Sequence, residues 1–194
     1  TDLLLFRDIT ARVAQGTPYY QAAAELQRQH LYPLRPFITV REPTLYVLAA
    51  RLGWTGMQVL AFAILSGCIA AWANALKTRV SRAEMLGGLT GIMLGALAIS
   101  ARGLLTGTEP WLRLLLTLAL GCRLSGWHRA ELVAVGAALL VRELALPYAL
   151  LATVFALWDR DWPALRRWLI LIAAFAGAMA VHAHFQMQTV RPGD

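Results

Sequence analysis

The sequence predicts an all-α protein, a polytopic transmembrane helical bundle with an amphipathic helical first outer loop. Hydrophobic residues make up 58% of the 194 residues and charged residues only 15%, with a mean hydropathy of +0.55. Soluble domains are, by comparison, roughly half apolar and a quarter charged. The only long polar stretch is residues 1–43. We therefore predict an outer-surface loop over residues 1–43 and a membrane domain over residues 44–194.

The net charge indicates the kind of partner, and the positions of the cysteines indicate their role. The net charge is +7, but the basic residues flank the apolar runs and form no clustered stripe. Anionic membrane lipid, rather than nucleic acid, is the predicted counter-charge. Cys68 and Cys122 lie inside apolar runs, where cysteine behaves as a small hydrophobe. No glycine motif for ATP or a dinucleotide is present, so we predict no cofactor.

The N-terminal arm, residues 1–43, is predicted to be two short helices followed by a Pro-rich extended part. Residues 2–14 place apolar side chains at helical spacing, with charged side chains elsewhere on the wheel. A Gly-Thr-Pro sequence ends this helix and starts a second that reaches about Gln29. Two X-Pro pairs within residues 32–36 force extended backbone. Pro43 then opens a further short helix that Gly53 ends.

The remaining chain is divided into apolar runs by short polar connections. A membrane-spanning helix needs about 20 apolar residues, so the domain has room for about six segments. They are predicted at about 55–76, 85–105, 111–123, 131–142, 144–158 and 168–186, with a loop at 159–167.

Residues 131–158 could instead form one long helix, of about 42 Å at 1.5 Å per residue. Arg142 and Glu143 would then lie near its middle, and a charge at mid-bilayer costs at least about 2.5 kcal/mol. Two segments that meet at these residues, with Pro147 early in the second, avoid this cost. We predict the hairpin.

The same hairpin model divides the loops between two sides. Residues 77–84, 123–130 and 159–167 share one side and are rich in Lys and Arg, which predicts a cytoplasmic location. The arm and the tip at Arg142 lie on the other side. The five arginines of the arm act against this orientation.

Four short motifs occur in an order that resembles one family of membrane enzymes. They are D-x-x-L-F-R-x-I from Asp2, G-T-P-Y-Y-x-A-A-A, Y-P-L-R-P-F-I-T-V-R-E-P-T-L and L-V-R-E-L-A-L-P-Y. This order resembles the C-type (GT-C fold) glycosyltransferases of bacterial membranes, which take a sugar from a polyprenyl-phosphate carrier. The hydrophobic helix that precedes the first motif in that family is not in this sequence, so we expect a fragment that is inactive alone.

The resemblance implies a function and a location. The chain would transfer a sugar from a polyprenyl-phosphate donor to an acceptor at the outer face of the bacterial inner membrane. The protein would be multi-pass, with its first polar loop in the periplasm and with membrane lipid and the lipid-linked sugar as partners. The sugar, the acceptor and any divalent metal stay open. The alternative from another class is a non-catalytic membrane subunit or a small transporter. A transporter should show broken helices in matching positions of two halves, and Pro147 has no counterpart.

The resemblance also implies candidate site residues, each with a simpler reading beside it. Asp2 is the candidate catalytic base, and its simpler reading is the N-cap of the helix that it precedes. Asp8 is the weaker candidate for the base, and its simpler reading is a solvated helix residue. The predicted substrate-binding residues are Arg142, Glu143, Arg41, Tyr19 and Tyr20.

For these five residues the simpler readings are structural. Arg142 and Glu143 could neutralise each other, Arg41 could pair with Glu42 at the interface, and the two tyrosines could form an aromatic belt. His182 and His184 are two residues apart and so not on one helix face, so no metal site is predicted.

Overall fold

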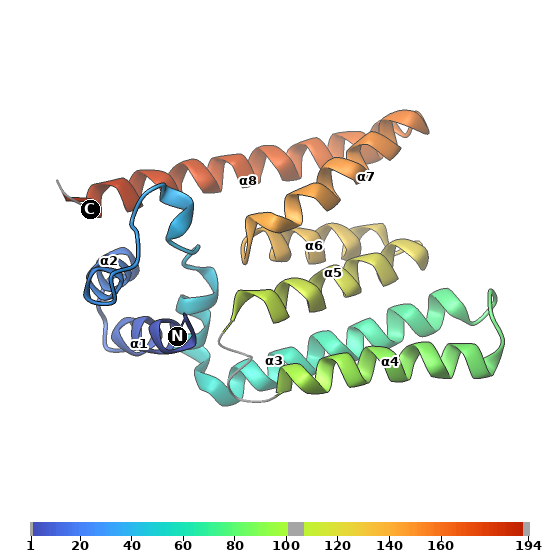
Figure 1. Cartoon of the computed structure of the whole chain (residues 1–194). Helices are drawn as coiled ribbons and strands as arrows, with labels where there is room; N and C mark the ends of the chain where they lie inside the picture. Colours follow the sequence, from blue (N-terminus) through green and yellow to red (C-terminus); the bar gives the residue numbers. More distant parts are fainter. Residues whose placement is uncertain (1, 101–106, 192–194) are drawn as a thin grey trace.

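The structure is a computed structural model that describes residues 2–100 and 107–191, with side chains over 3–96 and 107–191. In these ranges it is all-helical, with no strand. Figure 1 shows the long helices lying side by side, with the N-terminal arm and the C-terminal end of α8 at one end of the molecule. The connections α3–α4, α5–α6 and α7–α8 lie at the opposite end. The predicted division of the loops between two sides agrees with this arrangement.

The arm folds as the proline and glycine pattern predicts. It contains α1 (Asp2–Ala14), α2 (Tyr19–Gln29) and the 3-10 turn η1 (Phe37–Thr39). An ion pair of 2.7 Å between Arg12 and Glu25 joins the two helices. The apolar side of α1 is buried, and Phe6 stacks on Tyr46 with 4.3 Å between ring centroids. The arm is therefore packed against the first long helix.

The C-terminal part of α8 holds the arm from its other side. Gln186 is fully buried and donates a hydrogen bond of 2.7 Å to the carbonyl oxygen of Leu34. Arg28 donates to the carbonyl oxygen of Thr189. The first bond satisfies a backbone carbonyl of the extended segment, and the second satisfies a carbonyl at the C-terminal end of α8.

Helix α3 (Thr44–Leu76) is two helices joined at a glycine. Gly53 has φ 67° and ψ 175°, a conformation that side-chain-bearing residues rarely adopt. The predicted short helix after Pro43, ended by Gly53, is confirmed. The longer part, residues 54–76, corresponds to the first predicted segment.

Helices α4 (Arg82–Ser100) and α5 (Thr108–Leu124) follow. Ser81 and Glu84 form a reciprocal capping box at the start of α4. Helix α5 packs closely on α3, because Gly121 lies against Trp72 and a Cβ there would come within 2.8 Å of its ring. The predicted segment 85–105 extends into residues 101–106, which lie outside the described residues.

The predicted break in residues 131–158 is confirmed. Helix α6 (His128–Leu139) ends before Arg142, the 3-10 turn η3 (Glu143–Ala145) follows, and α7 (Leu146–Trp158) begins with a proline in its first turn. Arg142 has extended backbone, with φ −163° and ψ 131°. The predicted bounds of the first segment, 131–142, were three residues too late at both ends.

The predicted loop 159–167 is wrong in its second half. Helix α8 (Trp162–Thr189) begins six residues before the predicted segment. Asp161 caps it by accepting a hydrogen bond of 2.9 Å from the Ala164 N–H, and Pro163 occupies its first turn. The turn between α7 and α8 is therefore only residues 159–161.

Two stretches are long and apolar enough to cross a membrane, by length and composition alone. They are Phe37–Leu76, which contains α3, and Trp162–Thr189, which is α8. The helical character of the prediction is thus confirmed, whereas the polytopic membrane bundle stays a prediction.

Candidate functional site

Two charged dipeptides and a single glutamate that are far apart in the sequence meet at the arm end of the molecule. Each lies where a helix begins or a turn changes direction: Arg41 and Glu42 just before α3, Glu109 in the first turn of α5, and Arg142 and Glu143 between α6 and α7. We call these five residues the arm-end cluster. The break at Arg142 is what places the last pair here.

Arg142 is the centre of the cluster. Its guanidinium forms an ion pair with Glu109 and lies 3.5 Å from the Thr108 hydroxyl. Its Nε is buried and has no hydrogen-bond partner in the part of the chain that the structure describes. The simpler alternative, in which Arg142 and its neighbour Glu143 neutralise each other, does not hold, because Arg142 pairs with Glu109. One N–H of the guanidinium fork therefore stays available to an acceptor.

Glu42 is the buried acid of the cluster. Its side chain is only 8% exposed, and its Oε1 has no hydrogen-bond partner among the described residues. Burial, followed by the negative charge of Glu143, raises its pKa from 4.5 to about 7. The suggested ion pair between Arg41 and Glu42 does not form, so Glu42 is a carboxyl whose proton exchanges near neutral pH.

Glu109 has the opposite electrostatic environment. Partial burial opposes its ionisation, but a hydrogen bond from its own backbone and the hydrogen bond and charge of Arg142 outweigh that effect. Arg41 adds a further positive charge, and the pKa of Glu109 is lowered. The cluster thus contains one ionised carboxylate on an arginine and one carboxyl poised to gain or lose a proton.

The two tyrosines lie in different environments. Tyr19 is buried, and its hydroxyl donates a hydrogen bond of 2.5 Å to the carbonyl oxygen of Arg41. It is neither a sugar platform nor part of an exposed belt. Tyr20 is half-buried, stacks on Phe185 and places its hydroxyl 3.1 Å from His182 Nδ1. Both rings support the segment that carries Arg41 and Glu42.

Of the two predicted catalytic aspartates, only Asp8 has a described side chain. Asp2 begins α1, and its side chain lies outside the described residues. Asp8 is exposed and lies 4.0 Å from His30, which fits the alternative of a solvated helix residue. Arg41, Arg142 and Glu143 are brought together, whereas Asp8 is not among them.

Sequence reasoning missed Glu42 and Glu109 as site residues. Each stands directly before a proline at the start of a helix, in the dipeptides Glu42-Pro43 and Glu109-Pro110. Proline restricts the preceding residue to non-helical or first-turn backbone, so the carboxyl is held at the helix end. The repeated Glu-Pro was the signal that could have found both.

The cluster can bind an anion and move a proton. Arg41 and Arg142 supply positive charge, and the Glu42 carboxyl can act as general acid or base because its pKa is near neutral. In the described residues, no three His, Cys, Asp or Glu side chains are grouped as ligands of a metal ion. Comparisons with protein-family models, curated protein sequences and solved structures found no match.

Proposed function

We propose that the chain is part of an integral membrane protein, with the long helices in the bilayer and the arm on its surface. Large apolar side chains are exposed on the outer sides of α3, α4, α6, α7 and α8. Soluble monomers rarely expose contiguous apolar patches beyond a few hundred Å². The exposed residues include Val59, Phe62, Leu86, Leu94, Val133, Leu150, Val154, Ile170 and Val181.

Within that membrane setting, the proposed activity is transfer of a sugar from a polyprenyl-phosphate donor, in the manner of the C-type glycosyltransferases. The observation that carries it is Glu42, a buried carboxyl with a raised pKa and an oxygen that has no partner among the described residues, in the cluster that also contains Arg41 and Arg142. A transfer site needs both parts, a cation for the departing phosphate and a base for the acceptor hydroxyl.

The roles follow from the chemistry of each side chain. The acceptor oxygen attacks the anomeric carbon, and its proton passes to the Glu42 carboxylate. The bond from that carbon to the phosphate oxygen breaks, and the polyprenyl phosphate leaves with the electron pair. Arg142 and Arg41 stabilise the phosphate through charged hydrogen bonds, for which the arginine fork is suited. Glu42, rather than Asp2, is the base in this proposal.

The test is transfer from a radiolabelled polyprenyl-phosphate sugar by membranes of cells that express the intact protein. E42Q should reduce transfer by a factor of about 100 or more, in the range of general-base catalysis, and leave donor binding within about twofold. Asp8→Asn is the matched control, because it removes an exposed carboxyl of the same arm. Wild-type transfer by E42Q would rule out Glu42 as the base, and no transfer by the unaltered protein would assign the chain to the non-catalytic membrane subunits.

Donor binding gives a second, separate readout. Arg142→Ala should weaken binding of the lipid-linked donor by about 1.5 to 3 kcal/mol, the value of one hydrogen bond to a charged group. Because this change also releases Glu109, R142A should be compared with the double variant R142A/E109Q, in which position 109 carries no charge left unpaired by the loss of Arg142. Unchanged donor affinity in both would show that the phosphate is held elsewhere.

A further inference from the structure

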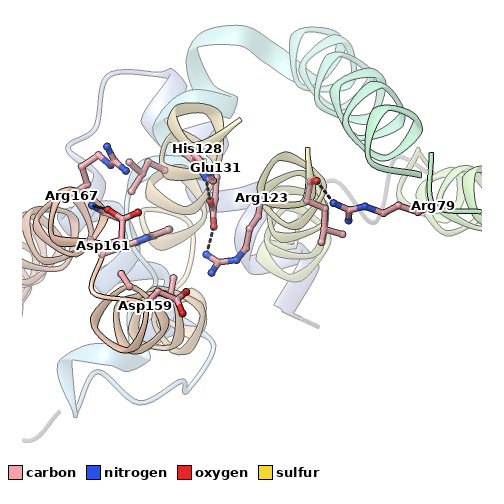
Figure 2. A pocket seen from close by; sticks show the side chains of 13 residues that line it. Arg79, Arg123, His128, Glu131, Asp159, Asp161 and Arg167 are labelled. Carbon is pink, nitrogen blue, oxygen red and sulfur yellow. Dashed lines mark hydrogen bonds and ion pairs between the residues drawn. The ribbon is translucent and has the colours of Figure 1, made fainter. Parts of the chain in front are cut away.

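A charged cavity lies at the end of the molecule opposite the arm-end cluster. Its volume is about 350 Å³, and its walls come from α5, α6, α7, α8 and the turn after α3 (Figure 2). Six charged side chains line it: Arg79, Arg123, Glu131, Asp159, Asp161 and Arg167. None of them belongs to the site described above.

A buried ion pair fixes one wall. Glu131 is only 2% exposed, and it accepts hydrogen bonds of 3.0 Å from both Arg123 and the Tyr148 hydroxyl. His128 Nδ1 lies 3.6 Å from its other oxygen. Because Arg123 binds Glu131 through one Nη, the rest of its guanidinium remains available to a ligand in the cavity.

The short α7–α8 turn places acidic side chains on the facing wall. Arg160 has φ 55°, and the Asp161 N–H donates to the carbonyl oxygen of Ala156 at 2.9 Å. This tight turn puts Asp159 and Asp161 on the cavity while Arg160 does not line it. Asp159 and Arg167 are exposed, and their side chains have no hydrogen-bond or ion-pair partner in the part of the chain that the structure describes.

The positive and negative side chains that line the cavity are equal in number, which favours a ligand that carries both charges. Three arginines and three carboxylates line the cavity, and Figure 2 shows Arg167 beside Asp161, so a simple anion would also meet carboxylates and a simple cation would also meet arginines. A ligand with a phosphate at one end and an ammonium group at the other has partners for both kinds of side chain. The lining also includes apolar side chains of Leu132, Ala152 and Ala156. Around it, Trp127, Trp158 and Trp162 are exposed, as in an interfacial aromatic belt.

We propose that this cavity binds a phosphoethanolamine headgroup, with the phosphate on Arg123 and Arg167 and the ammonium on Asp159 and Asp161. The source is either an intact phosphatidylethanolamine or free phosphoethanolamine. The inference uses the membrane placement proposed above but not the transfer reaction, so E42Q should leave it unchanged.

The experiment measures lipid retained by the purified full chain in detergent, by native mass spectrometry. Phosphatidylethanolamine should be retained about tenfold more than phosphatidylcholine, whose ammonium has no N–H donor, or phosphatidylglycerol, which has no ammonium. D159N and R167Q should each reduce this retention about tenfold, the loss expected for one hydrogen bond to a charged group. Both side chains are exposed and unpartnered, so neither change should impair folding.

Matched controls and competition complete the test. Arg166→Gln removes the neighbouring charge, which does not line the cavity, and should leave retention unchanged. Displacement by millimolar free phosphoethanolamine would identify the headgroup alone as sufficient, and no displacement would identify the intact lipid as the source. Equal retention of phosphatidylglycerol, or an equal loss in R166Q, would overturn the proposal.

Discussion

At the scale of single residues, the environment of Glu42 determines how stability depends on pH. Its pKa is about 7 in the folded chain, against 4.5 in an exposed chain, because burial and the charge of Glu143 oppose ionisation. Between these values the unfolded chain is deprotonated while the folded chain keeps its proton. Stability therefore falls as the pH rises through this window, and it is highest below it.

This gives a first prediction, for E42Q. The wild type should lose about 1 to 3 kcal/mol of stability between pH 4.5 and 7, and the neutral amide should remove that loss. The thermal midpoint in detergent, followed by tryptophan fluorescence at pH 5 and pH 8, measures it. Asp8→Asn, at an exposed carboxyl of the arm, is the control and should keep the wild-type difference. A wild-type midpoint that does not fall with pH would contradict the assignment.

A second prediction at this scale concerns the bond that holds the extended part of the arm. Gln186→Leu keeps the side-chain volume but leaves the buried carbonyl of Leu34 without its donor, at a cost of about 1 to 3 kcal/mol. Gln188→Leu is the matched control on the same helix, where the side chain is exposed. Limited proteolysis should cut within residues 30–42 faster in Q186L than in Q188L. Equal rates would mean that α8 does not secure the arm.

At the scale of elements, Gly53 sets the angle between the two parts of α3. Its φ of 67° with ψ near 180° is strained for any residue with a Cβ, although nothing lies within 4 Å of the position a Cβ would take. Gly53→Ala should therefore lower stability by about 1 to 3 kcal/mol through backbone strain alone. Gly91→Ala, in the open middle of α4, should be neutral or slightly stabilising. Equal thermal midpoints of the two variants would contradict backbone strain at Gly53.

The elements also show what sequence reasoning could and could not predict. The arm helices, the Gly53 break and the break at Arg142 follow from local signals, namely proline, glycine and the cost of charge in an apolar run. The start of α8 was missed because Asp161 and Pro163 were read as loop residues, although they are also a cap and a first-turn proline. The pairing of Arg142 with Glu109 depends on how α5 and α6 pack, and no local pattern contains that information.

At the scale of the whole molecule, two charged sites lie at opposite ends of a bundle with apolar outer sides. The arm-end cluster combines two arginines with a carboxyl that titrates near neutrality, whereas the opposite cavity has balanced fixed charges. In the membrane placement that we propose, each site would lie at a different surface. The two sites then meet different lipid headgroups and different aqueous compartments.

The topology of that placement gives the last prediction. The loops at the cavity end and the adjoining first turn of α6 carry Lys77, Arg79, Arg129 and Arg160, and basic short connections remain in the cytoplasm, so the arm should face outside. Both native cysteines are buried, so single introduced cysteines should report alone. An impermeant maleimide added to intact cells should label Gln29→Cys, at the exposed end of α2, and should label Thr78→Cys, in the exposed α3–α4 turn, only after permeabilisation. The reverse pattern would place the Glu42 carboxyl on the cytoplasmic side, and labelling of both without permeabilisation would contradict a membrane bundle altogether.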